Sequence, residues 1–342
     1  MWPGATARAE RVCAAHRCSV VDTSAITHRT VEVDGLRLHL AEAGPPDGPV
    51  VLLLHGFPEC WYSWRHQLGA LAAAGFRAVA PDQRGYARSD APAAVEAYTL
   101  LHLVGDALGV LDAMGTERAV VVGHDWGAPV AWHAALLRPD RVRGVVGLSV
   151  PFRTRTGTRP TDALARGFGP GYYMLHFQEP GVADAELAAD PRATFRRLLS
   201  RGGGGAPPPR LIVEPGGGFL DALPEPAALP DWLTDADLDA YVAEYCERGF
   251  TGGLNWYRNL DRNWELTAAW QGAQVTPPAL YLAGEQDVVI AGAPFDAVVE
   301  SLRGSVRDLR GATALPGCGH WTQQERPDEV SAAIVEFART LP

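Results

Sequence analysis

The stretch AVVVGHDWGAPVAWHAALL, residues 119–137, decides the local geometry on which the rest of the fold depends. Its first four residues form a valine-rich apolar run typical of a buried strand, and APVAWHAALL is typical of a helix. Between them, GHDWG puts Asp125 in a sharp turn with a glycine two places away on each side. A strand–turn–helix of this kind often presents a nucleophilic serine. Here a carboxylate stands in its place, so the chemistry must be one that a carboxylate can perform.

Other apolar runs repeat the strand pattern along the chain, at 50–55, 77–81, 144–150 and 278–284. Helical patterns alternate with them, at 60–74, 99–114 and 126–138, and DEVSAAIVEFART closes the chain. Strands without an alternating polar face, separated by helices, predict a mostly parallel sheet covered by helices on both faces. Alternating residues at 29–33 and 36–43 predict an antiparallel hairpin before this core, and a short strand is expected at 312–316.

Composition restricts the possible partners. The chain has 342 residues, 47% apolar content and a formal net charge of −10. An acidic balance without a basic run argues against nucleic acid and anionic membranes as partners. No run of 18 apolar residues occurs, and the N-terminus lacks an apolar signal core, so we expect a cytoplasmic protein.

The five cysteines do not form a disulfide framework. Cys13 and Cys18 make a C-x4-C pair with His16 nearby, but no second half-site follows, so we expect no metal site and no organic cofactor. Residues 1–27 are interpreted as an N-terminal extension without an assignable role.

The interval 151–270 interrupts the alternation of strands and helices. It is rich in aromatic residues, glycine and proline, and its helical patterns at 184–200, 235–248 and 253–262 have no strands between them. We interpret it as a helical lid inserted into a core formed by 28–150 and 271–342, covering the carboxyl ends of the strands, where pockets form. The RGGGGAPPPR run at 201–210 lacks the lysine of a phosphate loop and predicts a surface loop.

Three residues in chain order predict a nucleophile, an acid and a histidine. Asp125 comes first, Asp287 follows the strand LYLAG, and His320 lies in PGCGHW before the last helix. Glu285 is an alternative acid. HGFP at 55–58 follows an early strand, where a backbone N–H can stabilise an oxyanion, together with the N–H after the nucleophile. These two donors would be Phe57 and Trp126.

Six motifs carry a resemblance that runs from about residue 29 to the C-terminus: HGFPECWYSWRHQL, DQRGYARSDAP, GHDWG, FQEPGVADAEL, LNWYRNLDRNW and GCGHWTQ. They resemble those of the epoxide hydrolases of the α/β-hydrolase fold, both the bacterial members and the hydrolase domain of the mammalian soluble enzyme. The resemblance implies an α/β-hydrolase core with a helical lid, hydrolysis of small hydrophobic epoxides to vicinal diols, and a detoxifying role.

The resemblance also implies site residues. The triad maps onto Asp125, Asp287 and His320, and two lid tyrosines map onto Tyr173 and Tyr257, with Tyr172 as an alternative to Tyr173. A carboxylate can displace the ring oxygen of an epoxide, and a phenol that stays protonated at neutral pH can protonate it. Seven residues in or beside these motifs are expected to form an apolar pocket: Phe57, Trp61, Trp126, Met174, His176, Phe177 and Trp256. His176 stands where the family leads us to expect an aromatic side chain.

Two other functions use the same residues. Haloalkane dehalogenases also combine an elbow aspartate with a following tryptophan, but a departing halide needs no proton, and the lid tyrosines favour the epoxide. An inactive fold that binds a small hydrophobic ligand is the alternative of another class. A serine esterase is disfavoured because Ser149 follows a strand without a glycine-flanked turn. The sequence predicts neither the particular epoxide nor the oligomeric state.

Overall fold

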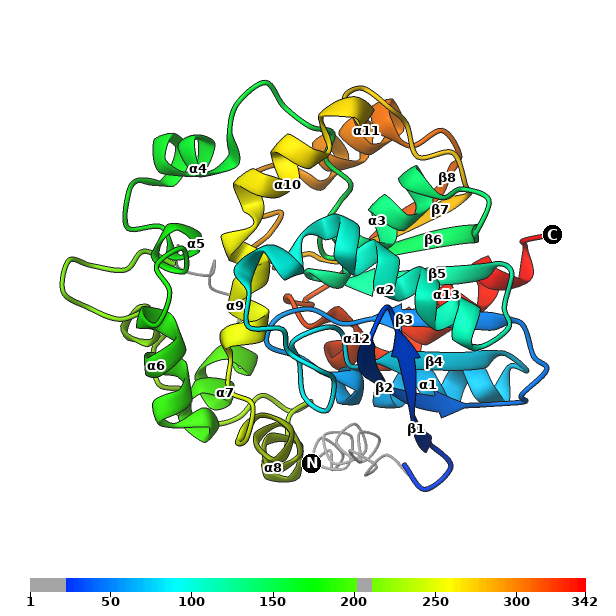
Figure 1. The fold of residues 1–342 in the computed structure, drawn as a ribbon, viewed down its shortest axis with the longest axis horizontal. Coiled ribbons are helices and arrows are strands. Elements are labelled where there is room, and N and C mark those ends of the chain that lie inside the picture. The colour runs from blue at the N-terminus through cyan, green and yellow to red at the C-terminus, as the bar shows by residue number, and fades with distance from the viewer. Residues whose placement is uncertain (1–22, 202–210) are drawn as a thin grey trace, which may run out of the picture.

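A computed structural model describes residues 23–201 and 211–342. Its centre is an eight-stranded sheet in the order β1-β2-β4-β3-β5-β6-β7-β8 (Figure 1). The strands are β1 (Thr27–Val33), β2 (Leu36–Ala43), β3 (Val50–Leu54), β4 (Arg77–Pro81), β5 (Ala119–His124), β6 (Val142–Leu148), β7 (Ala279–Gly284) and β8 (Leu309–Leu315). The pairs β1–β2 and β2–β4 are antiparallel and the remaining pairs are parallel. The predicted hairpin and mostly parallel sheet are therefore confirmed.

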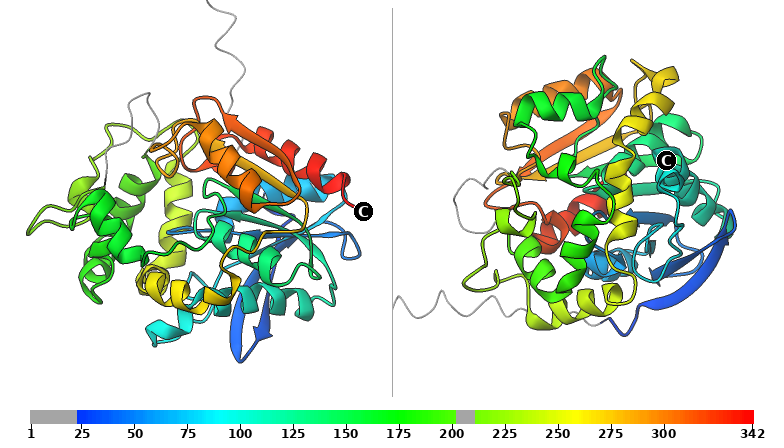
Figure 2. Two further views of the ribbon diagram at one scale, coloured as in Figure 1. Left: turned by 90° about the horizontal axis from the view of Figure 1, so that it is seen from above. Right: turned by 60° about the vertical axis from the view of Figure 1, so that its left-hand side comes forward.

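Helices cover both faces of the sheet because the central strands are apolar on both sides. Every residue of β3 and of β5 is buried. Helices α1 (Arg65–Ala73) and α13 (Pro327–Arg339) contact each other on one face, and α2 (Leu100–Ala113) and α3 (Gly127–Leu137) contact each other on the other (Figure 2). Helix α11 (Phe295–Ser305) packs on β8, and the short α12 (Thr322–Glu325) precedes α13.

The chain between β6 and β7, residues 149–278, forms what we call the helical segment. It lies beside the sheet in Figure 1 and contains, in its described part, α4 (Pro160–Phe168), α5 (Tyr173–His176), α6 (Val182–Ala189), α7 (Pro191–Leu199), α8 (Asp235–Tyr245), α9 (Thr251–Arg258) and α10 (Leu260–Leu266). The described part of the segment has no named strand, only two isolated bridges: one joins Tyr172 to Ile212, and the other joins Val275 to Val306 outside the segment.

Three predicted helices were wrong in extent. The helix predicted at 184–200 is two helices, because Asp190 has extended backbone and its side chain accepts a hydrogen bond from Ala193 N–H to start α7 at Pro191. The helix predicted at 253–262 is divided between α9 and α10 at Asn259. The pattern at 60–74 begins with a 3₁₀ turn, Trp61–Trp64, before α1.

Helices α4, α5, α11 and α12 were not predicted. Cys13, Cys18 and residues 202–210 of the surface loop predicted at 201–210 lie outside the described residues. Within the described residues, no helix is long and apolar enough to cross a membrane.

Candidate active site

Asp125 lies on a tight turn between β5 and α3, with a backbone φ of +48°. Glycine is required on both sides of it because of close backbone contacts. A Cβ on Gly123 would come within 2.1 Å of the Gly127 carbonyl oxygen, and one on Gly127 within 2.0 Å of the Leu54 carbonyl oxygen. A left-handed φ is costly for a residue with a side chain and is typical of functional sites. The sequence GHDWG therefore permits the tight turn that places the Asp125 carboxylate beyond the end of β5.

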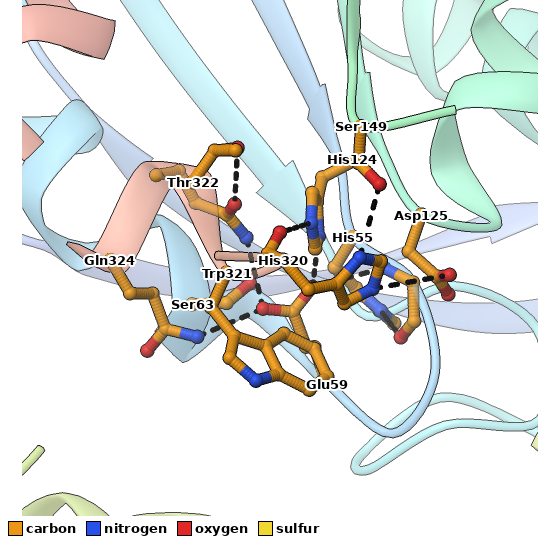
Figure 3. A network of polar contacts seen from close by, with 12 residues as sticks. His55, Glu59, Ser63, His124, Asp125, Ser149, His320, Trp321, Thr322 and Gln324 are labelled. Atoms are coloured by element: carbon orange, nitrogen blue, oxygen red, sulfur yellow. Dashed lines mark hydrogen bonds and ion pairs between the residues drawn. The ribbon is translucent and has the colours of Figure 1, made fainter. Parts of the chain in front are cut away.

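His320 connects Asp125 to Asp287. It lies between β8 and α12, and its Nε2 is 3.5 Å from Asp125 Oδ2 (Figure 3). Its Nδ1 is 3.0 Å from Oδ1 of Asp287, a fully buried residue that follows β7. The N–H of Val289 donates to the same oxygen of Asp287 at 2.9 Å. The structure thus brings the three predicted triad residues together.

The alternative acid does not contact the histidine. Glu285 instead accepts a hydrogen bond from Gly317 N–H at 3.1 Å. Ser149, just past β6, has a φ of +69° and its hydroxyl lies 3.1 Å from Nδ1 of His320 (Figure 3). Ser149 therefore lies behind the histidine ring, beside Asp287, and it does not face the Asp125 carboxylate.

The charges of Asp125, His320 and Asp287 depend on one another. Burial disfavours the imidazolium of His320, but the carboxylates of Asp287 and Asp125 outweigh burial and raise the pKa of His320 to about 10. Burial likewise opposes ionisation of both carboxyls, yet contact with His320 lowers the pKa of Asp125 and the pKa of Asp287. The resting site therefore holds an imidazolium between two carboxylates at neutral pH.

The loop after β3 supplies a donor to the nucleophile. The Phe57 N–H donates to Asp125 Oδ1 at 2.8 Å, as expected for the HGFP motif. Trp126 is the residue after the nucleophile, but among the described hydrogen bonds none joins its N–H to the Asp125 carboxylate. Its role as second donor stays a prediction.

Two phenols face the carboxylate from the helical segment. Tyr173 begins α5 and Tyr257 lies near the end of α9, with ring centroids 6.1 Å apart. Both line the same cavity as Asp125 and His320. Burial raises the pKa of each phenol well above its usual value, so both keep their proton at neutral pH.

The alternative Tyr172 lies elsewhere. It does not line the cavity, and its ring stacks on Phe168 with centroids 4.3 Å apart. Tyr173 is therefore the tyrosine of this pair that reaches the site.

The cavity differs from the predicted pocket. Of the seven predicted residues only Phe57 lines it. Trp61 instead donates its indole N–H to Glu244 at 3.3 Å, and Trp256 donates its own to the Arg84 carbonyl at 3.2 Å. These two side chains serve packing because both indole N–H groups have partners away from the site.

The other predicted pocket residues are also absent from the cavity lining. Trp126 and Phe177 both pack on the Tyr257 ring, with centroids 5.1 Å away in each case. His176 Nε2 lies 3.8 Å from a Glu186 carboxylate oxygen. Met174 packs against the hydrophobic core without lining the cavity.

Seven lining residues were missed by the sequence analysis: Leu198, Arg201, Leu211, Phe219, Val288, Val289 and Trp321. Val288, Val289 and Trp321 directly follow predicted triad residues in the chain, so adjacency was a usable signal. Arg201 ends the α7 region beside the glycine-rich run, and Phe219 lies in an irregular stretch. Nothing in their local sequence indicated that they reach the site.

The cavity is a mainly apolar space with carboxylate, imidazole and phenol groups on its wall. Among residues 23–201 and 211–342, no cluster of three or more His, Cys, Asp or Glu side chains could hold a metal ion. An ionised carboxylate beside a histidine and a backbone N–H, facing two protonated phenols, can form and then hydrolyse an ester.

The chain is similar to proteins of known fold and activity. The profile of the alpha/beta hydrolase fold matches residues 49–197, which defines the class. Epoxide hydrolase A of Mycobacterium tuberculosis is 50% identical over 92% of this chain and 98% of its own length. Epoxide hydrolase 3 of Siraitia grosvenorii is 43% identical over 91% of this chain and 98% of its own length.

Solved structures agree with these relatives. The crystal structure of epoxide hydrolase A from Mycobacterium thermoresistibile has 51% identity and a TM-score of 0.85, covering 93% of this chain and 99% of that chain. An epoxide hydrolase from an endophytic Streptomyces has 47% identity and a TM-score of 0.88, covering 92% and 96% respectively. The chain belongs to the epoxide hydrolase family of the α/β-hydrolase fold, as the motifs had indicated.

Proposed function

We propose that this chain hydrolyses epoxides to vicinal diols through a covalent ester on Asp125. One observation carries the proposal: a single cavity holds the Asp125 carboxylate, bound by Phe57 N–H and His320, and the phenols of Tyr173 and Tyr257. These groups supply a nucleophile, a base and two acids, which is the set that opening an epoxide and hydrolysing an ester requires.

The first step forms the ester. Asp125 Oδ1 accepts the Phe57 N–H at 2.8 Å, whereas Oδ2 has the longer contact of 3.5 Å with His320 Nε2, so Oδ2 is the oxygen proposed to attack an epoxide carbon from the side opposite the ring oxygen. As the C–O bond of the ring breaks, its electron pair stays on oxygen, and Tyr173 or Tyr257 transfers a proton to it. Before attack, the same phenols can hold the ring oxygen by hydrogen bonds and so orient the carbon.

The second step hydrolyses the ester. Ester formation converts Asp125 into a neutral group and removes one of the two carboxylates that hold the proton on His320. Loss of that proton restores the phenol and leaves His320 neutral, so that it can deprotonate a water for attack on the Asp125 carbonyl carbon. Asp287 stabilises the imidazolium that forms again, and Phe57 N–H stabilises the oxyanion, with Trp126 N–H proposed as second donor. When the oxyanion collapses, the bond between the carbonyl carbon and the ester oxygen breaks, and the proton of the new Asp125 carboxylic acid passes to the departing oxygen. This releases the diol and restores the Asp125 carboxylate beside the His320 imidazolium.

The helical segment is proposed to act as the lid over this site, because it contributes both phenols and several apolar wall residues. We also propose a cytoplasmic location. Cys60, Cys246 and Cys318 are free thiols, which suits a reducing compartment.

A single-turnover reaction in ¹⁸O-water tests the ester route. Excess enzyme is mixed with styrene oxide, and the peptide that contains Asp125 is analysed by mass spectrometry. We expect diol to form and one ¹⁸O to enter the Asp125 carboxylate, because water attacks the ester carbonyl. Diol without label in Asp125 would mean direct attack of water on the epoxide.

Two controls separate the other functions. Asp125→Ala should form no diol and no labelled peptide. Halide release from 1-bromobutane, without diol from a panel of epoxides, would identify a dehalogenase. Binding of epoxides without turnover of either class would identify a binding protein.

A further inference from the structure

We propose that Gln178 is a positioning residue that holds the phenols of Tyr173 and Tyr257 at the separation at which both can bind one epoxide oxygen. The inference rests on the proposed function and goes beyond it, because Gln178 is absent from the cavity lining. Its side chain instead connects α5, which carries Tyr173, with α9, which carries Tyr257 and lies beside α5 in Figure 1.

One amide group makes both connections. Nε2 of Gln178 donates to the carbonyl oxygen of Met174 at 2.8 Å and to that of Tyr257 at 2.9 Å. A carbonyl oxygen only accepts, so the amide nitrogen must face both acceptors and uses one hydrogen for each. Met174 directly follows Tyr173, so the amide binds the main chain beside one phenol and the main chain of the other.

Both acceptors lie at helix ends. The last carbonyl groups of a helix have no partner within it. Met174 belongs to the four-residue α5, and Tyr257 is the last residue but one of α9. The main-chain N–H of Gln178 donates to Leu175 at 3.2 Å, so it does not continue the α-helical pattern to Met174. The Gln178 side chain therefore binds the ends of both helices and fixes one relative to the other.

The residue before Gln178 takes part in a second connection. The fully buried Phe177 ring packs edge-on against both phenol rings, with centroids 5.4 Å from Tyr173 and 5.1 Å from Tyr257. The Phe177 carbonyl oxygen accepts a hydrogen bond from Nε of Arg258 at 3.1 Å, and Asp184 forms an ion pair with the same guanidinium. Each of the two segments thus donates a side-chain hydrogen bond to the main chain of the other.

The separation of the phenols matters because they share one target. Two hydroxyls can both bind a single oxygen only while they are within about 5.5 Å of each other, twice the length of an O–H···O bond. A misplacement of about 1 Å at a reacting group can cost roughly a hundredfold in rate. Aromatic packing is weakly directional, so we assign the control of this separation to the directional bonds of Gln178. This gives a role to contacts between two sequence motifs, FQEPGVADAEL and LNWYRNLDRNW.

The chain contains a matched control on the other side of the site. Gln67 of α1 is completely buried, and its Nε2 also donates to two main-chain carbonyls, that of Gln323 at 3.0 Å and that of Pro327 at 3.4 Å. It connects α1 with α12 and α13, and its amide bonds reach neither α5 nor α9.

The experiment compares Gln178→Met with Gln67→Met, two changes that keep the length of the side chain and remove the amide. Single-turnover kinetics with styrene oxide measure ester formation by intact-protein mass and ester hydrolysis by diol release. Each change is also made in the Tyr257→Phe background. Thermal unfolding measures the structural cost, and Arg258→Lys, which removes the Nε donor to Phe177, is the milder variant if Gln178→Met does not fold.

We expect Gln178→Met to slow ester formation by roughly tenfold, with ester hydrolysis within about threefold of the parent protein. In the Tyr257→Phe background the same change should slow ester formation by less than about threefold, because only one phenol is left to position. Gln67→Met should lower the unfolding temperature and leave ester formation within about threefold of the parent rate. Arg258→Lys should act like Gln178→Met, with a smaller effect.

Three results would overturn the positioning role. They are equal slowing of both steps in Gln178→Met, the same slowing of ester formation in Gln67→Met, and an undiminished effect of Gln178→Met in the Tyr257→Phe background. If Gln178→Met does not fold, an unchanged ratio of the two rates in Arg258→Lys has the same meaning. A parent protein that forms neither ester nor diol would instead reject the proposed function itself.

Discussion

The two walls of the cavity are built in different ways. On the sheet side, Asp125, Asp287 and His320 each follow a strand. His320 lies 3.0 Å from Asp287 and 3.5 Å from Asp125, and Phe57 N–H donates to Asp125 at 2.8 Å. On the helical side, three aromatic residues line the cavity beside two leucines and an arginine: Tyr173, Phe219, Tyr257, Leu198, Leu211 and Arg201. Tyr257 packs edge-on against the Tyr173 and Phe57 rings, with centroids 6.1 and 5.5 Å away.

This difference indicates that the two walls of the cavity serve different steps of the reaction. Hydrogen bonds are directional and hold the sheet side in one geometry, which hydrolysis of the ester needs. Aromatic packing is less directional and adapts to shape, which suits binding of a hydrophobic substrate. We therefore expect changes on the sheet side to impair ester hydrolysis and changes on the helical side to impair ester formation or substrate choice.

The largest effect should follow from His320→Gln. Without a base, ester should form once and remain, and steady-state diol formation should fall by roughly ten thousandfold or more. Intact-protein mass after mixing with excess styrene oxide should show one adduct, located on Asp125. Steady-state turnover close to that of the parent protein would show that His320 is not the base.

Tyr257→Phe should have the next largest effect, on the other step. Loss of one proton donor should slow ester formation by roughly a hundredfold while ester hydrolysis stays close to the parent rate. Rapid-quench kinetics measure both steps. Tyr62→Phe is the matched control, because that ring does not line the cavity and its hydroxyl donates to Asp237 at 3.0 Å. Equal slowing of both steps by Tyr257→Phe would mean that the helical side does not act specifically in ester formation.

Phe219→Leu should alter substrate choice by a smaller amount. Phe219 lines the cavity and is almost fully buried, so a smaller side chain enlarges the helical wall. We expect the ratio of kcat/KM for two epoxides of different size to change by about tenfold, with ester hydrolysis unchanged. Phe195→Leu is the control, since Phe195 packs on Tyr241 and Tyr245 away from the cavity.

The last prediction concerns stability rather than rate, on the sheet side. Asp287 and Asp125 outweigh burial and raise the pKa of His320 to about 10, above the ordinary value of about 6.5 for an unfolded chain. The folded state therefore binds this proton more tightly. The resulting stabilisation is complete below about pH 6.5 and is lost as the pH rises towards 10.

Denaturant unfolding of the parent protein and His320→Gln at pH 6.5, 8 and 9.5 measures this contribution. The difference in the free energy of unfolding between the two should become less favourable to the parent as the pH rises. Tyrosines titrate in both proteins and largely cancel. A difference that does not depend on pH would mean that the folded state holds the His320 proton no more tightly than the unfolded chain.

The sequence by itself determined the sheet and the order of the catalytic groups. Strands β3 and β5 are buried on both faces and were visible as continuous apolar runs. Asp125, Asp287 and His320 come at the ends of strands, where chain order and local turns identify them. The glycines around Asp125 allow the close backbone contacts of this turn, which a Cβ at either position would block.

Only the tertiary structure decided which side chains line the cavity. Trp61 and Trp256 were expected there, but each indole found a hydrogen-bond partner elsewhere. Arg201 and Phe219 reach the cavity from segments whose local sequence shows no sign of it. The reason is physical: local sequence determines which residues are apolar or turn-forming, whereas the direction in which a buried side chain points depends on how distant segments pack.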